Sequence, residues 1–432
     1  MKLVYIADNR CRTNFGCRGT SIALSQLIST EHEIVGTVSG KYTHAGRGRL
    51  FFIPGLPKWI YVLLGKLPLW ETLKRMWGWT ISRNQGVYRA FDFLSDASET
   101  NFKNICRCLP ANKYLKEFDL RQYDFDGIVI NGEGTMIMTN PPRRDTLVYL
   151  MFIDWAKSMG KKVYLVNAMF SDCPATGTNK ETMETTHKAL MKCDAITVRD
   201  PVSLSYVKDK FSGIEVNYIP DALFTWKRYV DQIPSIMNGS YVLPFGQETD
   251  SEFDQFNFTE PYICVSGSSL AAWDQGAAYT SYKLLVESLK AETRLPVFLI
   301  QVCIGDRYLL DVGRDTNTPC LHVEIPILAG AKILSDAALY VSGRFHPSIM
   351  ASLGGTPCVF LGSNSHKTWS LQEMLEYEDI VEFSASPNES DIVNIVSLAK
   401  KKLAGGNVLR NKIERVVERR CKEANRLLDK IV

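Results

Sequence analysis

An arginine and a histidine lie two positions apart in the segment Ser342–Pro347, which reads SGRFHP. The apolar run Leu339–Val341 before them predicts a strand, and Ser348–Leu353 after them predicts a helix. An arginine can bind a carboxylate or phosphate through two parallel hydrogen bonds, and a histidine can exchange a proton near neutral pH. The pattern therefore predicts proton transfer on an anionic substrate, with Arg344 binding the anion and His346 moving the proton.

A second candidate is the loop Asn14–Thr20, which reads NFGCRGT and precedes the first helical pattern. Its glycines would let backbone N–H groups approach an anion, and the N-terminus of the helix adds partial positive charge. We therefore take Asn14, Gly16 and Arg18 as candidate substrate-binding residues. A plain turn with a helix cap is an alternative explanation.

Two glycines surround an acid in the loop Asn131–Thr135, which reads NGEGT and follows a predicted strand. Gly132 and Gly134 would make a tight turn that exposes the backbone to a substrate. Glu133 is then a candidate base, or a ligand for a sugar hydroxyl.

Charged residues follow other predicted strands as well. Arg199 and Asp200 come directly after one strand, Asp221 follows the next, and Lys367 follows the last. Arg199 is a further candidate for anion binding. The alternative is that Arg199 and Asp200 form a structural pair or a helix cap.

These loops need a scaffold that brings strand ends together. Apolar runs alternate with helix-length segments, which predicts mostly parallel sheets with helices on both faces. In such sheets, ligands bind beyond the carboxyl ends of the strands. The runs are Leu3–Ala7, Glu33–Val38, Gly127–Asn131, Lys162–Ala168, Ala195–Arg199, Val216–Ile219, Tyr262–Val265, Val297–Cys303, Ala338–Val341 and Cys358–Leu361.

The predicted fold is α/β, with two Rossmann-like lobes that face a cleft. We place the first lobe at residues 1–228, with a basic and aromatic insertion at 41–90. A polar linker at 229–260 leads to the second lobe at 261–406. The final segment, 407–432, predicts a helix that crosses back to the first lobe.

Composition excludes several classes of function. The 432 residues carry a net charge of only +3, which argues against a nucleic-acid partner. The eleven cysteines lack a paired spacing, which favours reduced thiols in the cytoplasm, and no metal-binding signature is present. The N-terminus reads as a strand rather than a signal peptide, and no apolar run is long enough to predict a membrane-spanning helix.

The insertion differs from the rest of the chain. From Lys41 to Arg89 the sequence has nine basic residues and one acidic residue. Residues 49–89 also contain four tryptophans, among them Trp59 and Trp70. Tryptophan and basic side chains together favour contact with a membrane surface. The alternatives are aromatic packing on the first lobe and an oligomer contact.

Taken in order, these loops resemble the polysaccharide pyruvyl transferase family. The resemblance covers about Lys2–Gly40 and Asp126–Leu375, and Arg344-Phe345-His346 with Gly355-Thr356-Pro357 is its most specific part. The other matching segments are Asn14-Phe15-Gly16, Ile130–Thr135, Arg199-Asp200, Pro220-Asp221 and Lys367. The chain departs from the family pattern at Cys17, where an aspartate is expected, at Glu133 within a glycine run, and at Pro347, where alanine is common.

The resemblance implies two lobes of glycosyltransferase-B-like type and transfer of pyruvate from phosphoenolpyruvate to a sugar as a ketal. The acceptor would belong to a cell-surface polysaccharide or its lipid-linked precursor, and no cofactor is implied. Arg199 and Arg344 would hold the anionic groups of the donor, and Lys367 would add positive charge near the leaving phosphate. His346 would donate a proton or contact phosphate, while Glu133 or Asp221 would act as base.

Two alternatives remain at this point. A sugar-nucleotide glycosyltransferase of the same fold would also use the helix that follows Arg344 to bind a diphosphate. A non-catalytic sugar- or lipid-binding protein is disfavoured, because arginines and a histidine occur at three strand ends. For an enzyme with a lipid-linked acceptor, we expect a cytoplasmic protein held peripherally at the inner face of the membrane.

Overall fold

The computed structural model describes residues 1–40, 55–68, 94–111, 113–173, 176–232 and 256–432. These residues form two compact units. Unit 1 comprises Met1–Cys11, Leu24–Ile219 and Arg426–Val432, and unit 2 comprises Arg12–Ala23 and Pro220–Asn425.

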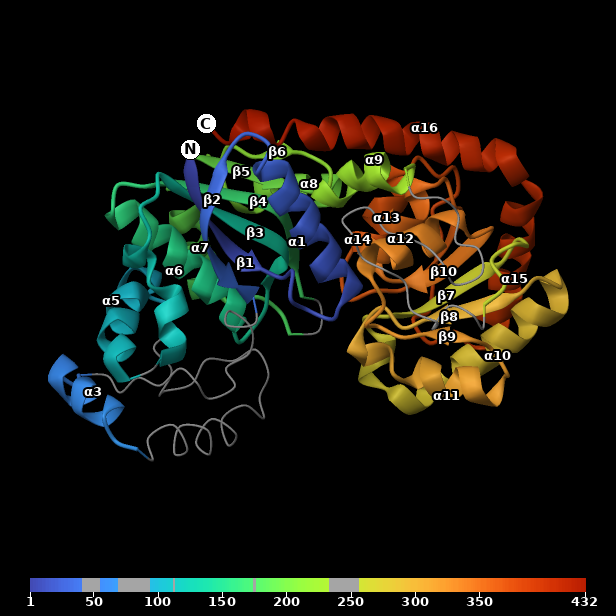
Figure 1. Ribbon diagram of the computed structural model, residues 1–432, viewed down its shortest axis with the longest axis horizontal. Coiled ribbons are helices and arrows are strands. Elements are labelled where there is room, and N and C mark those ends of the chain that lie inside the picture. Colours follow the sequence, from blue (N-terminus) through green and yellow to red (C-terminus); the bar gives the residue numbers. More distant parts are fainter. Residues whose placement is uncertain (41–54, 69–93, 112, 174–175, 233–255) are drawn as a thin grey trace. The chain divides into compact units, whose positions relative to one another are not determined.

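Unit 1 is built on a sheet whose described strands are all parallel, in the order β2-β1-β3-β4-β5-β6. Residues Leu3–Ala7 of β1 are completely buried, as expected for a strand covered by helices on both faces. The strands are β1 (Lys2–Asp8), β2 (Glu33–Ser39), β3 (Gly127–Met138), β4 (Lys162–Asp172), β5 (Ala195–Val198) and β6 (Asn217–Tyr218). The helices are the end of α1 (Phe15–Ile28), α3 (Lys58–Gly65), α5 (Ser98–Cys108), α6 (Arg144–Ser158), α7 (Lys180–Leu190) and α8 (Pro201–Lys210) (Figure 1).

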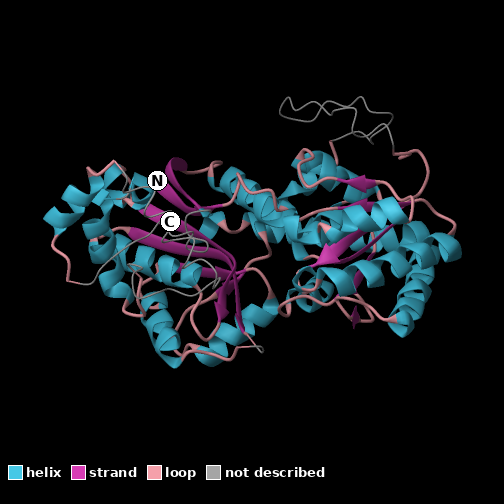
Figure 2. Ribbon diagram, turned by 90° about the horizontal axis from the view of Figure 1, so that it is seen from below, coloured by secondary structure: helices cyan, strands magenta, loops and turns pink. Residues whose placement is uncertain are grey.

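Unit 2 repeats the plan, with parallel strands in the order β12-β11-β10-β7-β8-β9. The strands are β7 (Ile263–Ser268), β8 (Val297–Ile300), β9 (Cys320–Leu321), β10 (Leu339–Gly343), β11 (Cys358–Leu361) and β12 (Glu382–Phe383). Helices lie on both sides of this sheet (Figure 2). They include α9 (Lys227–Val230), α10 (Gln275–Thr293), α11 (Tyr308–Asp315), α12 (Ile327–Asp336), α13 (Phe345–Leu353), α14 (Lys367–Met374), α15 (Glu389–Ala404) and α16 (Gly406–Asn425).

The predicted α/β fold with two Rossmann-like parts is confirmed by these two parallel sheets. The compact units nevertheless divide the chain differently from the predicted lobes. Arg12–Ala23 belongs to unit 2, because the buried Phe15 packs on Gly330 and donates its N–H to the Val302 carbonyl at 2.9 Å. The change of unit after Ile219 comes nine residues before the predicted boundary at 228.

The last seven residues, Arg426–Val432, belong to unit 1, where the Tyr164 hydroxyl donates to the Val432 carbonyl. Most of the predicted insertion and linker, at residues 41–54, 69–93 and 233–255, lies outside the described residues. No helix in the described ranges has the length and hydropathy of a membrane-spanning segment.

Candidate active site

His346 pairs with a buried aspartate in unit 2. β10 ends at Gly343 and α13 begins at Phe345, so His346 lies in the first turn of the helix. Its Nε2 lies 3.2 Å from Oδ2 of Asp221, whose side chain is completely buried. Oδ1 of Asp221 accepts hydrogen bonds from the Thr20 hydroxyl at 2.7 Å and the Leu223 N–H at 3.0 Å. A carboxylate held by two donors can orient the imidazole.

This geometry changes the role of Asp221. We predicted it as one of two candidate bases for a sugar hydroxyl. A completely buried carboxylate that receives hydrogen bonds from Thr20 and Leu223 is instead placed to position His346. Because the carboxylate accepts, Nε2 of His346 carries the proton shared with Asp221.

The loop that contains Asn14 and Gly16 packs against the Nδ1 side of the His346 ring. A Cβ atom on Gly16 would lie 2.5 Å from Nδ1 of His346, so only glycine allows this close approach. Oδ1 of Asn14 accepts the Cys17 N–H at 3.2 Å, which is the helix-cap arrangement considered as the alternative for this residue. Gly16 thus brings the backbone against His346, while Asn14 fixes the start of α1.

Arg18 carries a charge that no described carboxylate neutralises. One guanidinium nitrogen, Nη2, donates to the Ile325 carbonyl at 3.1 Å, and the buried Nε has no hydrogen-bond partner among the described residues. The guanidinium lies over the Phe15 ring, 5.4 Å from its centre. Burial lowers the pKa of Arg18, and no acidic group contributes to the shift. A half-buried cation of this kind can bind an anion.

Arg344, by contrast, has a buried counterion. Its Nη2 forms an ion pair with Oδ1 of Asp306, and the two side chains are 13% and 0% exposed. Burial disfavours the charge on Arg344, but Asp306 outweighs this effect and raises the pKa of the guanidinium. Asp306 lies in a short helical turn, η7 (Ile304–Asp306), after β8. The pair connects this turn to the start of α13, so Arg344 does not present an unpaired charge.

Lys367 begins α14, which follows β11. Its Nζ donates to Oδ1 of Asn364 at 2.6 Å. Unit 2 therefore brings Asn14, Gly16, Asp221 and His346 together, while Arg18, Arg344 and Lys367 make separate contacts.

Glu133 lies in a second polar cluster, in unit 1. Its carboxylate is 6% exposed and accepts hydrogen bonds from Nδ2 of Asn9 at 2.7 Å and Nδ2 of Asn131 at 3.0 Å. Asn167 of β4 donates to Oδ1 of Asn131 at 3.4 Å. Asn131 and Glu133 lie inside β3, so the predicted tight turn is instead part of a strand that continues to Met138. The cluster joins β3, the middle of β4 and the residue after β1, and its amides and carboxylate are suited to bind sugar hydroxyls.

The backbone of this cluster adopts unusual conformations. The φ angles of Ala7, Glu133 and Asn167 are 63°, 37° and 54°, which non-glycine residues rarely adopt. Such conformations concentrate at functional sites, where the surrounding structure maintains them. Gly132 has a packing role, since a Cβ there would lie 2.4 Å from the Ala168 Cβ.

Arg199 lies near the same part of β3. It is 2% exposed, its Nη2 is 3.8 Å from the Met169 sulfur, and a Cβ on Gly134 would be 4.0 Å from that nitrogen. Asp200 caps α8 by accepting the Ser203 N–H at 2.8 Å. Asp200 therefore has the helix-cap role considered as the alternative.

Sequence reasoning missed several of these contacts. Asp306, Thr20, Asn9, Asn131 and Asn167 were not singled out. An acid soon after β8, and asparagines within or just after three neighbouring strands, were the available signals. Among the described residues, no three His, Cys, Asp or Glu side chains gather as metal ligands.

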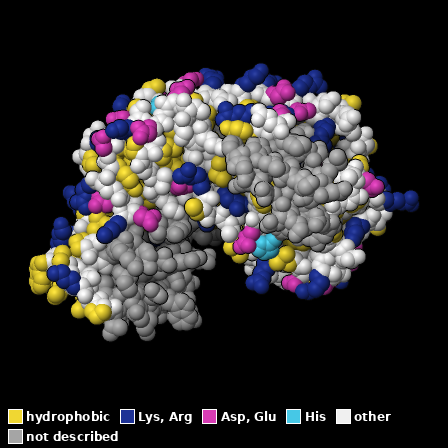
Figure 3. Space-filling model, viewed as in Figure 1, with side chains coloured by type: hydrophobic (Ala, Val, Ile, Leu, Met, Phe, Trp, Pro, Cys, Tyr) yellow, Lys and Arg dark blue, Asp and Glu magenta, His cyan; other side chains and the backbone are white. Residues whose placement is uncertain are grey.

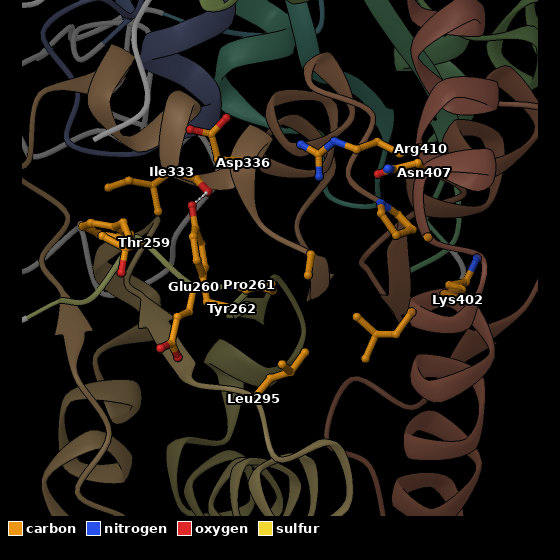
Figure 4. A pocket seen from close by; sticks show the side chains of 15 residues that line it. Thr259, Glu260, Pro261, Tyr262, Leu295, Ile333, Asp336, Lys402, Asn407 and Arg410 are labelled. Carbon is orange, nitrogen blue, oxygen red and sulfur yellow. Dashed lines mark hydrogen bonds between the residues drawn. The ribbon is translucent and has the colours of Figure 1, made fainter. Parts of the chain in front are cut away.

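A cavity of about 600 Å³ lies elsewhere in unit 2 (Figure 4). Tyr262, Ala338 and Pro357, which line it, come just before β7, β10 and β11. The cavity is therefore at the amino ends of these strands, opposite the end that carries His346. Lys402 also lines it, and burial lowers the pKa of this lysine to about 8. None of the predicted site residues contributes to it.

Two Rossmann-like units, each built on a parallel sheet, define a glycosyltransferase-B-like fold. Solved structures share this fold. UGT89C1 from Arabidopsis thaliana, complexed with UDP-L-rhamnose, has a TM-score of 0.53 and 11% identity, covering 100% of this chain and 98% of that one. UDP-GlcNAc 2-epimerase from Neisseria meningitidis has a TM-score of 0.52 and 11% identity, covering 97% and 98%. The same epimerase from Methanocaldococcus jannaschii gives 0.51 and 11%, covering 97% and 99%.

The family follows from sequence. The model of the polysaccharide pyruvyl transferase family matches residues 82–365, and the chain belongs to this family. No curated protein matches the chain. The predicted family and the predicted class of enzyme, a transferase, are thus confirmed, whereas the solved structures support only the fold.

Proposed function

We propose that this pyruvyl transferase uses phosphoenolpyruvate as donor and forms a pyruvate ketal on two hydroxyls of a sugar. The observation that carries the proposal is the His346–Asp221 pair beside Gly16, together with Arg18 in the same helix, whose charge no described carboxylate neutralises. The donor has a carboxylate and a phosphate, so it needs a cation. It also has a carbon–carbon double bond that must be protonated, so it needs an acid.

The proposed steps balance as follows. The His346 imidazolium keeps its Nε2 proton on Asp221 and gives its Nδ1 proton to C3 of the donor, and C2 becomes electrophilic. A first sugar hydroxyl adds to C2 and loses its proton. The bond from C2 to the phosphate oxygen then breaks, and phosphate leaves. The second hydroxyl adds to C2 and loses its proton, which completes the ketal.

We assign the anionic groups of the donor to Arg18 and to the N-terminal end of α1. Arg18 replaces Arg344 in this role, because Arg344 already pairs with Asp306. Glu133, held by Asn9 and Asn131, is the proposed base for the acceptor hydroxyl. Arg199 and Lys367 remain candidates for further contacts with donor or acceptor.

Thermal unfolding with candidate ligands tests the donor. Phosphoenolpyruvate should raise the unfolding temperature of the wild type, and UDP should not. Arg18→Gln should raise the concentration of phosphoenolpyruvate needed for the same protection about 10- to 150-fold, because one charge-assisted hydrogen bond is lost. Arg314→Gln, at an exposed arginine with its own acidic partners, is the matched control. Protection by UDP alone would overturn the proposal in favour of a sugar-nucleotide glycosyltransferase, which the fold alone supports.

We further propose that the acceptor is a lipid-linked glycan or a cell-surface polysaccharide, and that the protein works in the cytoplasm at the inner face of the membrane. A lipid-linked acceptor would confine the reaction to that surface. The mass of the product gives a direct test of the transfer, because ketal formation adds pyruvate minus water. An added mass of a whole sugar residue would contradict it.

A further inference from the structure

α3 is held on unit 1 by one face. Tyr61 is completely buried in the core of the unit, and Leu64 packs against the same core. A Cβ atom on Gly65 would lie 2.4 Å from the Pro110 carbonyl oxygen, so the end of the helix lies tightly against its neighbour. These contacts fix which side of α3 faces away from the core.

The outward side is apolar. Trp59, Val62, Leu63 and Leu67 are 67%, 40%, 56% and 47% exposed. Trp59, Val62 and Leu63 are separated by three and four residues and therefore share one face of the helix. We call these four residues the α3 apolar face. Exposed tryptophan and leucine in such a group are unusual on a protein surface without a partner.

Positive charge surrounds this face. Lys58 and Lys66 are exposed near the two ends of the helix, and residues 55–68 contain no acid. Yellow and dark blue side chains lie together at the lower left of Figure 3, where Figure 1 places α3. Two copies of a surface that carries two lysines and no acid over residues 55–68 would repel each other, which argues against a homodimer contact.

We propose that the α3 apolar face binds an anionic membrane surface. The tryptophan and aliphatic side chains would enter the interface between head groups and acyl chains, and the lysines would contact anionic head groups. The inference rests on the proposed function for its lipid-linked acceptor. It deepens that function, because it names the surface that brings the enzyme to the acceptor.

Flotation with vesicles tests the inference on the full chain. The wild type should float with vesicles of phosphatidylcholine and phosphatidylglycerol, bind less at high salt, and bind weakly to phosphatidylcholine alone. Trp59→Ser with Leu63→Ser should reduce binding at least about 10-fold. Lys58→Gln with Lys66→Gln should reduce binding about 10- to 30-fold. The control Val393→Ser with Val408→Ser changes two side chains that are 68% and 81% exposed in unit 2, and it should bind like the wild type.

Three results would overturn the inference. The first is a wild type that does not float with anionic vesicles. The second is that the α3 variants float as well as the wild type and unfold at the same denaturant concentration. The third is a wild-type dimer that Trp59→Ser with Leu63→Ser converts to a monomer. Transfer to a soluble sugar is measured separately, so loss of the proposed function and loss of membrane binding are distinguishable.

Discussion

Replacing Arg344 distinguishes a residue that binds substrate from one that holds the fold. A substrate-binding arginine would lose activity on substitution and leave stability unchanged. The structure predicts a large loss of stability, because Arg344→Ala leaves the completely buried carboxylate of Asp306 without its cation. Removing one partner of a buried ion pair costs about 3–5 kcal/mol.

The loss in free energy of unfolding lowers the melting temperature by a measurable amount. In a domain of about 150–250 residues, each kcal/mol lowers the melting temperature by about 2–4 °C, so Arg344→Ala should melt about 6–20 °C lower. Calorimetry and urea unfolding measure the loss. Asp306→Ala should also destabilise, and the double variant should lose less than the sum of the two, with a coupling of at least about 1 kcal/mol. Arg314→Ala, whose acidic partners are exposed, should stay within about 0.5 kcal/mol of the wild type.

One result would refute this reasoning. If Arg344→Ala unfolded at the wild-type midpoint and lost pyruvyl transfer, the guanidinium would serve the substrate, and its pairing with Asp306 would contribute nothing measurable. Additive effects in the double variant would likewise show that the pair is not coupled.

Three further predictions concern proton transfer and pH. His346→Gln should lower kcat about 10²- to 10⁴-fold while phosphoenolpyruvate still protects against unfolding; lost protection with unchanged kcat would contradict proton transfer. Glu133→Gln should lower transfer by a similar factor of about 10² or more without changing donor protection, and an unchanged rate would remove Glu133 as base. Burial lowers the pKa of Lys402 to about 8 from its ordinary 10.5. The folded protein therefore binds this proton less tightly than the unfolded chain does. Wild-type stability should rise from pH 8 to pH 10.5 as a result. Lys402→Met should therefore be more stable than wild type at pH 7, by up to about 3 kcal/mol, with the advantage disappearing by pH 10.5, whereas exposed Lys401→Met should show no such trend in urea unfolding.

The strands were predictable because buried parallel strands give short apolar runs between helical segments. β1, β4 and β10 follow the predicted runs closely. The carboxyl end of β10 also led to His346, whereas Glu133 lies inside β3 and not in a loop after it. Local patterns report which residues lie at a strand end, and the topology of a parallel sheet brings strand ends together.

Partners distant in sequence were not predictable. Asp306 lies 38 residues from Arg344, and Thr20 lies 201 residues from Asp221. No local spacing connects such pairs, so the sequence left Arg344 as an unpaired anion-binding residue and Asp221 as a base. The division of α1 between the units has the same cause, since it depends on the packing of Phe15 against Gly330.

The way the chain passes between the units limits how related enzymes can be recombined. A chimera joined near residue 220 would take Asp221 and His346 from one parent. It would take Gly16 and Thr20 from the other, although Gly16 packs against the same histidine and Thr20 donates to the same aspartate. A lobe exchange that preserves donor handling must therefore carry residues 12–23 with the C-terminal part of the chain.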